Sequence, residues 1–334
     1  MDDAKFGSRN DNGDWKPSNL WSYGPLFDFP TRPFKILKWI FSYPGFIFPW
    51  IFFYGLFGLI IWLFFTPSME TVKNLNASWI VYILIRNFLI IFCWFGFLHL
   101  RLYVKKGQGN AFKYNNEFLH KNSKPFLFGK QTYDNMFWTL CSGVPIWTAY
   151  EVFTLWNFAN GNFTYVNWQD NIIYCVLLLF LLPIWENLHF YLGHRFLHAK
   201  FLYKYAHHVH HKNVNPGPWS GLAMHPIEHI IFFSSPLIFF ILPAHPIHAF
   251  YLWAFVGLAP AVHGHSGFDK FVAGKKVYFD TGGYNHYLHH KYFECNYADG
   301  FLPLDKWFGT FHDGSDEAQK KMIQRMKERQ PNII

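Results

Sequence analysis

The sequence predicts an all-α integral membrane protein with about four transmembrane helices, a membrane-dipping helical hairpin and a cytosolic helical cap. The composition is the first indication. Of the 334 residues, 51% are hydrophobic and only 15% are charged, whereas a soluble domain carries about 25% charged residues. The second indication is that the apolar residues fall in long runs, and the third is that closely spaced histidines follow the last of four such runs. The cap is expected to carry these histidines.

Four apolar runs predict the transmembrane helices. They cover residues 37–65, 78–100, 137–158 and 171–193. Each run is close to the ~20 residues that a helix needs to cross the hydrocarbon core. Residues 1–30 show no apolar core of a signal peptide, so we expect the first run to serve as its own insertion signal.

A fifth apolar stretch, residues 226–262, predicts the hairpin. It is broken by Pro236, Pro243, Pro246 and Pro260, and proline ends or kinks helices. The stretch separates two histidine clusters that must reach one site, so it must leave and return on the same side of the membrane. Two short spanning helices and a hairpin that only dips into the bilayer both satisfy this requirement.

The distribution of Lys and Arg predicts the orientation. These residues gather before the first run and in the loop 101–136, whereas the loop 66–77 holds only Lys73 and the loop 159–170 holds neither type. Positively charged loops remain in the cytoplasm. We therefore expect the N-terminus, the 101–136 loop and everything after the fourth run to be cytoplasmic.

Three histidine clusters indicate a metal site. They are His194-Arg-Phe-Leu-His198, His207-His-Val-His210-His211 and His286-Tyr-Leu-His289-His290. Spacings of three and four residues bring side chains onto one face of a helix. The eight imidazoles selected by this spacing exceed what one ion needs, and imidazole is a ligand for iron, zinc, copper and nickel. The clusters therefore predict two transition-metal ions.

The helical geometry also separates expected ligands from other histidines. His189 lies roughly opposite His198 on the fourth helix, and His208 turns away from its cluster, so we expect neither to bind metal. His265 follows the hairpin and is a candidate ninth ligand. His225, at the start of the hairpin, is either a ligand or a hydrogen-bonded neighbour of one.

The number and type of the expected metal ligands limit the kinds of reaction that the site could catalyse. Zinc hydrolases typically use about three protein ligands and a glutamate base, often in an HExxH motif, which this sequence lacks. Two irons can activate dioxygen and attack an unactivated C–H bond of a lipid. Imidazole alone does not distinguish iron from zinc, so a zinc-binding membrane hydrolase and a non-catalytic metal-binding membrane protein remain as alternatives.

Five sequence segments resemble the fatty acid hydroxylase/sterol desaturase superfamily. They are His194-Arg-Phe-Leu-His198, Lys204-Tyr-Ala-His207-His-Val-His210-His211, His225-Pro-Ile-Glu228, His265-Ser-Gly-Phe-Asp269, and Asn285-His-Tyr-Leu-His-His-Lys-Tyr-Phe293 followed by Asn296-Tyr-Ala298. The resemblance covers roughly residues 180–312. It implies an integral membrane di-metal oxygenase of the endoplasmic reticulum or bacterial inner membrane. Such enzymes use dioxygen and reducing equivalents to hydroxylate, demethylate or desaturate lipids, and the resemblance does not select the lipid.

The resemblance assigns site residues by position. It implies that the eight histidines of the three clusters are ligands. With His265 added, the expected set is His194, His198, His207, His210, His211, His265, His286, His289 and His290. Around them we expect Asn187, His225 and Asp269. Asn187 stands where family members often have an acidic residue, which neighbouring Glu186 can replace, and Asp269 stands where some members have a further histidine. The implied cofactors are two iron ions, with zinc able to take their place in purified protein, and dioxygen is the co-substrate.

The predicted partners are a lipid from the bilayer and an acidic electron-transfer protein. No flavin-binding or haem-binding motif occurs in the sequence, so we expect a b-type cytochrome or a ferredoxin, with its reductase, to supply electrons. The net charge of +8 includes Lys200, Lys204 and Lys212 after the fourth run, and a basic face attracts an acidic partner. The same lysines can instead meet anionic lipid headgroups. No nucleic-acid partner is expected.

The predicted organisation has four parts. These are a polar tail at 1–34, a transmembrane region at 35–170 with its cytosolic loop at 101–136, a fatty acid hydroxylase-like catalytic domain at 171–312, and a basic tail at 313–334.

Overall fold

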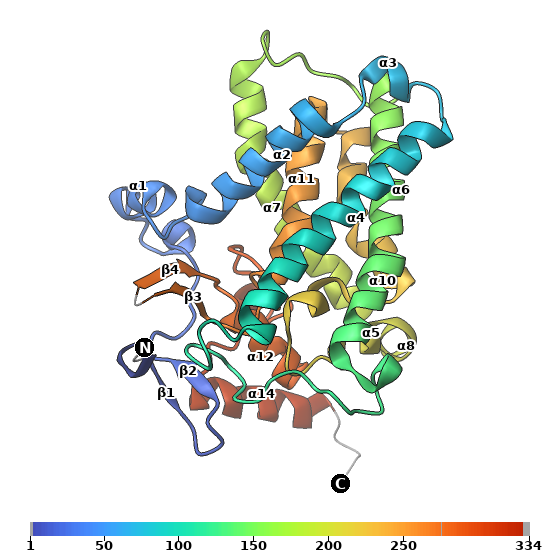
Figure 1. Ribbon diagram of the computed structural model, residues 1–334. Coiled ribbons are helices and arrows are strands. Elements are labelled where there is room, and N and C mark those ends of the chain that lie inside the picture. Colours follow the sequence, from blue (N-terminus) through green and yellow to red (C-terminus); the bar gives the residue numbers. More distant parts are fainter. Residues whose placement is uncertain (1–2, 275, 330–334) are drawn as a thin grey trace.

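The computed structural model describes residues 3–274 and 276–329, so residues 330–334 of the predicted basic tail lie outside the described part. The described chain is mostly helical, which confirms the predicted all-α membrane class (Figure 1). Long helices form a bundle at one end, and short helices with two small hairpins form a cap at the other. The hairpins are antiparallel pairs of β1 (Gly7–Arg9) with β2 (Trp15–Pro17) and of β3 (Lys270–Ala273) with β4 (Lys276–Asp280).

Three helices in the described part are long and apolar enough to cross a membrane. They are η3 (Ile47–Ile51) continued by α2 (Phe52–Phe65), α4 (Ala77–His99) continued by η4 (Leu100–Val104), and α7 (Ile172–Leu197). They coincide with three of the four predicted runs. Leu63, Ile85 and Leu177 on these helices are exposed, as expected for side chains that face hydrocarbon. The first run is shorter than predicted, because residues 33–41 form a separate helix, α1 (Pro33–Phe41).

The third predicted run, residues 137–158, falls on a more polar helix. Three segments follow one another there: α5 (Gln131–Trp138), η6 (Thr139–Gly143) and α6 (Val144–Ala159). Thr148 and Glu151 of α6 are buried and polar, which lowers the hydropathy of this stretch. Both face α4, where Arg86 donates to Glu151 and Asn87 Nδ2 donates to Glu151 Oε2 at 2.9 Å. The two intramembrane charges thus satisfy one another, as charges in a bilayer must.

The proline-rich stretch forms the expected hairpin. Its elements are α10 (Pro226–Phe232), η9 (Ser235–Phe240), α11 (Pro246–Leu258) and η10 (Ala259–Ala261). The turn reaches the end of the bundle opposite the cap, because Ala244 N donates to Thr164 O and Val166 N donates to Ala244 O, both at 3.0 Å. The hairpin therefore runs the full height of the bundle and does not merely dip into it. α11 is almost entirely buried and packs on α2 and α7.

The cap gathers the short elements and the N-terminal segment. Its helices are η1 (Asp3–Lys5), η2 (Pro25–Phe27), η5 (Leu127–Gly129), α8 (Lys200–Leu202), η7 (Tyr203–His207), α9 (His208–His211), η8 (Pro218–Leu222), α12 (Tyr284–Tyr292), α13 (Leu304–Trp307) and α14 (Asp316–Arg329). A further short helix, α3 (Met69–Val72), lies at the opposite end of the bundle.

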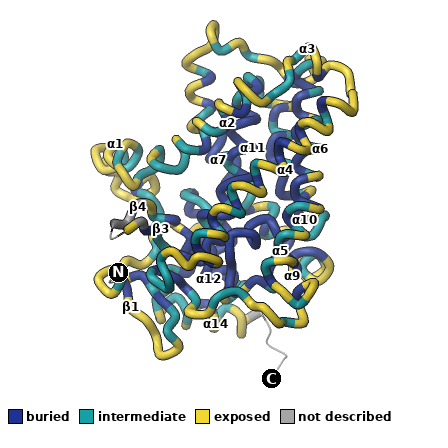
Figure 2. Tube along the Cα trace, viewed as in Figure 1, coloured by how far each residue is buried: buried dark blue, intermediate teal, exposed yellow. Residues whose placement is uncertain are grey.

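Aromatic contacts fix the N-terminal segment to the cap. Trp15 of β2 is buried against Phe112, with ring centroids 5.4 Å apart, and Tyr114 stacks on Tyr287 of α12 at 4.8 Å. The first hairpin is therefore packed against the helix that carries the third histidine cluster. Figure 2 shows α12 and much of α11 buried, whereas α1 is exposed.

Candidate metal centre

All nine histidines that the sequence selects lie together, where the bundle meets the cap. They form two groups, and within each group the candidate ligand nitrogens lie within 4.8 Å of one another. The first group, called here the five-histidine group, is His194, His198, His207, His211 and His289. The second, the four-histidine group, is His210, His265, His286 and His290.

The spacing within each cluster decides the group. Histidines four residues apart stay together, as do His194 with His198, His207 with His211, and His286 with His290. Residues four apart on a helix differ by about 40° in direction and those three apart by about 60° in the opposite sense. Consequently His210 and His289, three residues after the first histidine of their clusters, join the opposite group. Each of the second and third clusters therefore contributes to both groups.

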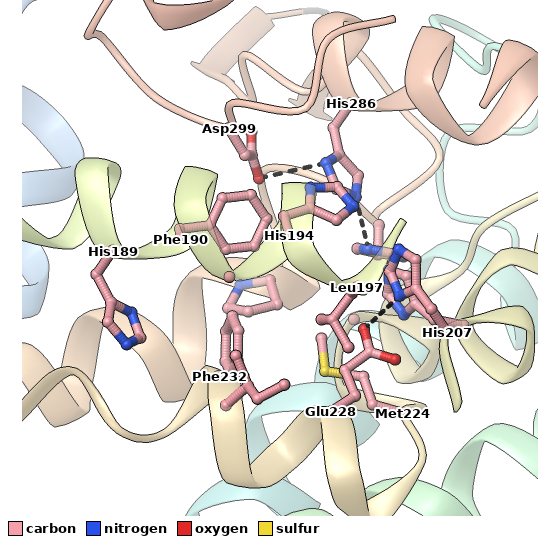
Figure 3. Close-up of a pocket in the computed structure, with 16 residues that line it drawn as sticks. His189, Phe190, His194, Leu197, His207, Met224, Glu228, Phe232, His286 and Asp299 are labelled. Carbon is pink, nitrogen blue, oxygen red and sulfur yellow. Dashed lines mark hydrogen bonds and ion pairs between the residues drawn. The ribbon is translucent and has the colours of Figure 1, made fainter. Parts of the chain in front are cut away.

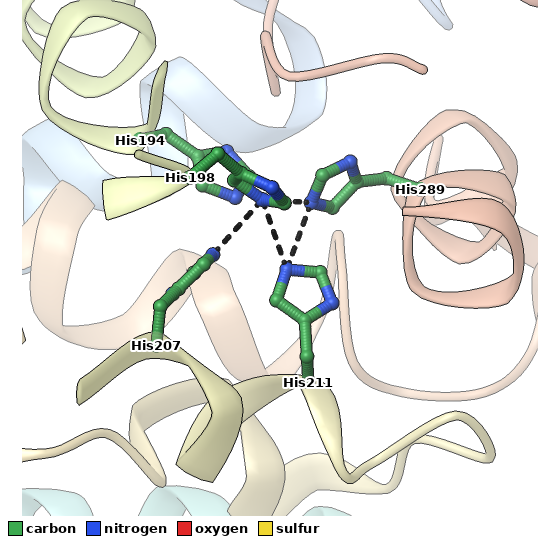
Figure 4. Close-up of side chains that lie close together, drawn as sticks. All are labelled: His194, His198, His207, His211 and His289. Carbon is green, nitrogen blue, oxygen red and sulfur yellow. Dashed lines mark hydrogen bonds between the residues drawn. The ribbon is translucent and has the colours of Figure 1, made fainter. Parts of the chain in front are cut away.

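The five-histidine group converges through its Nε2 atoms (Figure 4). His198 Nε2 lies 3.1 Å from His207 Nε2, 3.1 Å from His211 Nε2 and 3.3 Å from His289 Nε2. Two imidazoles about 2.0–2.1 Å from one ion and at right angles to each other have nitrogens about 3 Å apart. The observed separations match this spacing.

The four-histidine group has the same character. His286 Nε2 lies 3.0 Å from His265 Nε2 and 3.1 Å from His290 Nε2, and His290 Nε2 lies 3.2 Å from His210 Nε2. These histidines come from α9, α12 and the segment after η10, so the site depends on the whole cap.

Contacts at Nδ1 show that the convergent nitrogens carry lone pairs. His194 Nδ1 lies 2.8 Å from Tyr297 O, and His289 Nδ1 lies 2.6 Å from Cys295 O. A carbonyl only accepts, so both Nδ1 atoms hold the proton and both Nε2 atoms are bare. His207 Nδ1 likewise donates to the carboxylate of Glu228 at 2.9 Å.

His265 follows the same rule. Ser220 Oγ donates its one proton to Gly217 O at 2.8 Å and lies 2.8 Å from His265 Nδ1. Ser220 must therefore accept from His265, which leaves His265 Nε2 bare. Several lone pairs directed at one buried point repel each other unless a cation lies between them. The donor set thus fits two metal ions, one in each group.

Burial keeps these imidazoles in the neutral form that binds metals. It lowers the pKa of His198 to about 3, with the charge of Arg195 adding to the effect. It also lowers the pKa of His210 to about 3 and the pKa of His289 well below the ordinary value, and neighbouring histidines add to both shifts. Neutral histidines are ready to coordinate a metal without releasing a proton.

The three residues that were expected beside the metal ligands make other contacts, and the two histidines that were not expected to bind metal lie apart from the ligands. Asn187 Oδ1 accepts from Phe301 N at 2.8 Å and so holds a loop of the cap. His225 caps α10 through its Nδ1, and Asp269 accepts from Tyr114 Oη at 3.1 Å. His208 is exposed, and His189 Nε2 contacts Ser234 Oγ at 2.9 Å. All five lie outside both groups.

Other groups provide the observed contacts to the histidines. Glu228, Ser220 and the carbonyls of Cys295 and Tyr297 hold Nδ1 atoms, and Asp299 Oδ2 lies 3.7 Å from His286 Nδ1. The role of Glu228 could have been predicted from the sequence. A carboxylate commonly orients a metal-bound histidine, and Glu228 stands in the segment His225-Pro-Ile-Glu228. The backbone carbonyls carry no signal in the sequence.

Two adjoining cavities lie beside the histidines. The small cavity, about 40 Å³, is lined by His194, His207, His210, His265 and His286 among others (Figure 3). The large cavity, about 330 Å³, lies between α1 with η3 on one side and α7 with α11 on the other. The two share the lining residues Phe190, Phe232, Pro260 and Asp299. The large cavity is mostly apolar and has the size of a small-molecule site.

Comparisons with known proteins agree with this site. Residues 178–310 match the Fatty acid hydroxylase family. Methylsterol monooxygenase 1 of Gallus gallus is 32% identical over 165 residues, which cover 48% of this chain and 56% of the relative. Delta(7)-sterol 5(6)-desaturase of Gibberella zeae is 33% identical over 145 residues, which cover 43% of this chain and 39% of the relative. Methylsterol monooxygenase 1-2 of Arabidopsis thaliana is 31% identical over 162 residues, which cover 46% of this chain and 51% of the relative.

These matches confirm the resemblance to the fatty acid hydroxylase/sterol desaturase superfamily. The chain spans about half the length of the relatives, and the matched family region contains all nine histidines. No solved structure matches the chain.

Proposed function

We propose that this protein is a membrane oxygenase that uses two iron ions and dioxygen to hydroxylate, demethylate or desaturate a sterol-type lipid. The observation that carries the proposal is the pair of convergent histidine groups beside an apolar cavity. The family match and the names of the relatives support the reaction class and the substrate class.

The nine histidines are the proposed ligands, five for one ion and four for the other. Bound iron would supply the activation of dioxygen that an unactivated C–H bond requires. The protein contributes a preorganised donor set. Glu228, Ser220 and the carbonyls of Cys295 and Tyr297 fix the tautomers before any metal arrives, so that each Nε2 presents its lone pair.

The cavity walls serve the substrate. Phe190, Phe232 and Pro260 separate the large cavity from the histidines and present apolar surface to a lipid. A dry, apolar wall excludes water from the reacting carbon and prevents side reactions. The large cavity also reaches Trp39 of α1 and Trp50 of η3, so a lipid in the bilayer would enter beside these elements.

An external protein supplies electrons in this proposal. The donor is an acidic b-type cytochrome or a ferredoxin, and it docks on the cap. We place the cap on the cytoplasmic face of the endoplasmic reticulum or of a bacterial inner membrane. Lys200 and Lys204 lie close to the second histidine cluster in the chain and carry positive charge toward such a partner.

The proposal is tested with full-length protein purified in detergent and reconstituted anaerobically with ferrous iron. We expect turnover of a methylsterol with dioxygen, NADPH, cytochrome b5 and its reductase, and no turnover when the cytochrome is omitted. His207→Ala and His289→Ala should lose metal and activity. His208→Ala is the matched control, because His208 is exposed and lies outside both groups. Full metal content in both former variants would contradict the ligand assignment.

An all-imidazole donor set also fits zinc, which favours a zinc-binding membrane hydrolase as the second candidate. The same reconstitution separates the two. Activity that appears with zinc, without dioxygen or an electron donor, would replace the oxygenase proposal with a hydrolase.

A further inference from the structure

Asp299 lies at the junction of the two cavities. Among the described residues it is the only acidic one that lines both. Its side chain is 25% exposed and belongs to the loop that follows α12 (Figure 3). The carboxylate therefore faces the histidines on one side and the lipid cavity on the other.

The contact with His286 leaves most of the carboxylate available. Asp299 Oδ2 lies 3.7 Å from His286 Nδ1, which is longer than a hydrogen bond. A carboxylate has about four lone-pair sites. The oxygens of Asp299 can thus accept hydrogen bonds from a molecule in the large cavity.

The neighbouring side chains described next do not donate hydrogen bonds to the Asp299 carboxylate. His263, which lines the large cavity, has Nδ1 at 2.6 Å from Thr281 O and Nε2 at 3.1 Å from Tyr54 Oη. Both of its ring nitrogens are therefore occupied. The other residues shared by the two cavities, Phe190, Phe232 and Pro260, offer no side-chain donor. A carboxylate in such surroundings gains most from a ligand that brings its own donor.

We propose that Asp299 accepts a hydrogen bond from the hydroxyl group of a sterol-type lipid. The inference rests on the proposed function and names the residue that recognises the substrate. Because Asp299 lies beside His286, the hydroxyl is held at the metal end of the large cavity. The carbons next to the hydroxyl-bearing carbon then lie closest to the metal centre, and the remaining lipid extends toward Trp39 and Trp50.

Glu186 is the competing acceptor in the same cavity. It lines the large cavity but not the small one, it is buried, and its Oε2 has no hydrogen-bond partner. It precedes His194 by eight residues on α7, which is about 12 Å along the helix. A hydroxyl held by Glu186 would place the opposite end of the lipid at the metals. The two carboxyls therefore predict opposite orientations of the substrate.

The test measures lipid binding by the metal-depleted full-length protein in detergent, so that it does not depend on turnover. Trp21, Trp39 and Trp50 line the large cavity and can transfer excitation to dehydroergosterol, a fluorescent sterol with a free hydroxyl. Cholesterol and cholesterol methyl ether, which lacks the donor, then compete for the site. Asp299→Ala removes the acceptor, Asp299→Asn keeps an amide oxygen that accepts, and Glu186→Gln is the matched control. The metal content of each variant is measured separately after iron reconstitution.

We expect the wild type to prefer cholesterol over its methyl ether by about tenfold or more, as a hydrogen bond to a charged group provides. Asp299→Ala should lose this preference and keep its metal, Asp299→Asn should retain part of it, and Glu186→Gln should retain it. Three results would overturn the inference. Asp299→Ala could keep the preference for cholesterol, or Glu186→Gln could lose it. Asp299→Ala could also lose both its metal and its sterol binding. Equal binding of both competitors by the wild type would also overturn it while leaving a lipid oxygenase intact. Failure of the wild type to bind dehydroergosterol would refute the sterol class and the inference together.

Discussion

Glu228 Oε1 lies 2.9 Å from Nδ1 of His207, and both side chains are buried. Glu228 belongs to α10 and His207 to η7, so this contact ties the hairpin to the second histidine cluster. The carboxylate holds the proton on Nδ1 and turns Nε2 toward the other histidines of the five-histidine group. A carboxylate in this position also makes the imidazole a stronger ligand.

Replacement of Glu228 should therefore weaken metal binding without abolishing the fold. We expect Glu228→Gln to lower the metal affinity about 10- to 100-fold, because the amide can present its NH2 group to Nδ1 and favour the wrong tautomer. Competition with a chelator measures the affinity. Glu186→Gln serves as the control, since Glu186 is an equally buried glutamate that lines only the large cavity. Equal affinities of the two variants would contradict the role of Glu228.

The division into two groups predicts that single variants remove ions separately. His211→Ala should empty the five-histidine group and His290→Ala the four-histidine group, each reducing the iron content from about two ions per chain to about one. The Nε2–Nε2 contacts of 3.0–3.3 Å between histidines of the described chain each join two members of one group. Elemental analysis combined with Mössbauer spectroscopy distinguishes loss of one site from loss of both. Complete metal loss in each variant would indicate a centre that assembles only as a pair.

Eight of the nine expected ligands were predictable because helix geometry is local. A spacing of three or four residues fixes a common face, and the structure gathers the same nine side chains. The division into five and four is also implicit in that spacing, since pairs four residues apart stay together. His265 has no such periodic partner, and its place followed only from the return of the hairpin to the same side.

The surroundings of the ligands were not predictable to the same degree. Asn187 and Asp269 were selected because family members often carry an acidic residue or a further histidine at those positions, and His225 was selected because it begins the hairpin. The observed partners are brought to the histidines by the folding of the chain. Cys295 O and Tyr297 O are backbone atoms of a loop that folds back under α7 and α12, and any residue type provides a carbonyl. How far the hairpin extends along the bundle could not be predicted either, because its turn is held by backbone hydrogen bonds between Ala244 and the α6–α7 loop.

The metal-depleted protein should lose stability in acid. Burial lowers the pKa of His198 and of His210 to about 3, while an unfolded histidine titrates near 6.5. The unfolded state therefore binds more protons between these values, and stability is fully present above about pH 6.5 and falls as the pH drops toward 3. At pH 5 one such histidine should cost about 2 kcal/mol.

Thermal unfolding of chelator-treated protein at pH 7.5, 6 and 5, followed by tryptophan fluorescence, measures this dependence. His210→Asn should flatten it, because the amide does not titrate. An unfolding temperature that stays constant from pH 7.5 to 5 would show that the buried histidines are not the acid-sensitive groups.

The orientation in the membrane is tested by cysteine labelling. Asn122 in the 101–136 loop and Asn162 in the α6–α7 loop are exposed. The two loops lie at opposite ends of the bundle (Figure 1). In a background of Cys93→Ser and Cys141→Ser, which removes the exposed native thiols, we expect a membrane-impermeant maleimide to label Asn162→Cys in intact cells. Asn122→Cys should react only after the membrane is permeabilised. Labelling of Asn122→Cys alone in intact cells would reverse the topology.

The buried pair of Arg86 and Glu151 predicts a strong double-mutant coupling inside the membrane. Arg86 donates to Glu151 and, through Nη1, to Phe65 O at 2.9 Å, so it joins α4 to α6 and to the end of α2. Removal of one partner leaves an uncompensated charge where no water can solvate it, and Arg86→Met or Glu151→Leu should each cost about 3–5 kcal/mol. The double variant should be considerably more stable than the sum of the single effects, because neither charge remains. Unfolding of the purified variants in detergent measures all three values. Additive effects would show that the two side chains act independently and that the pair does not hold the helices together.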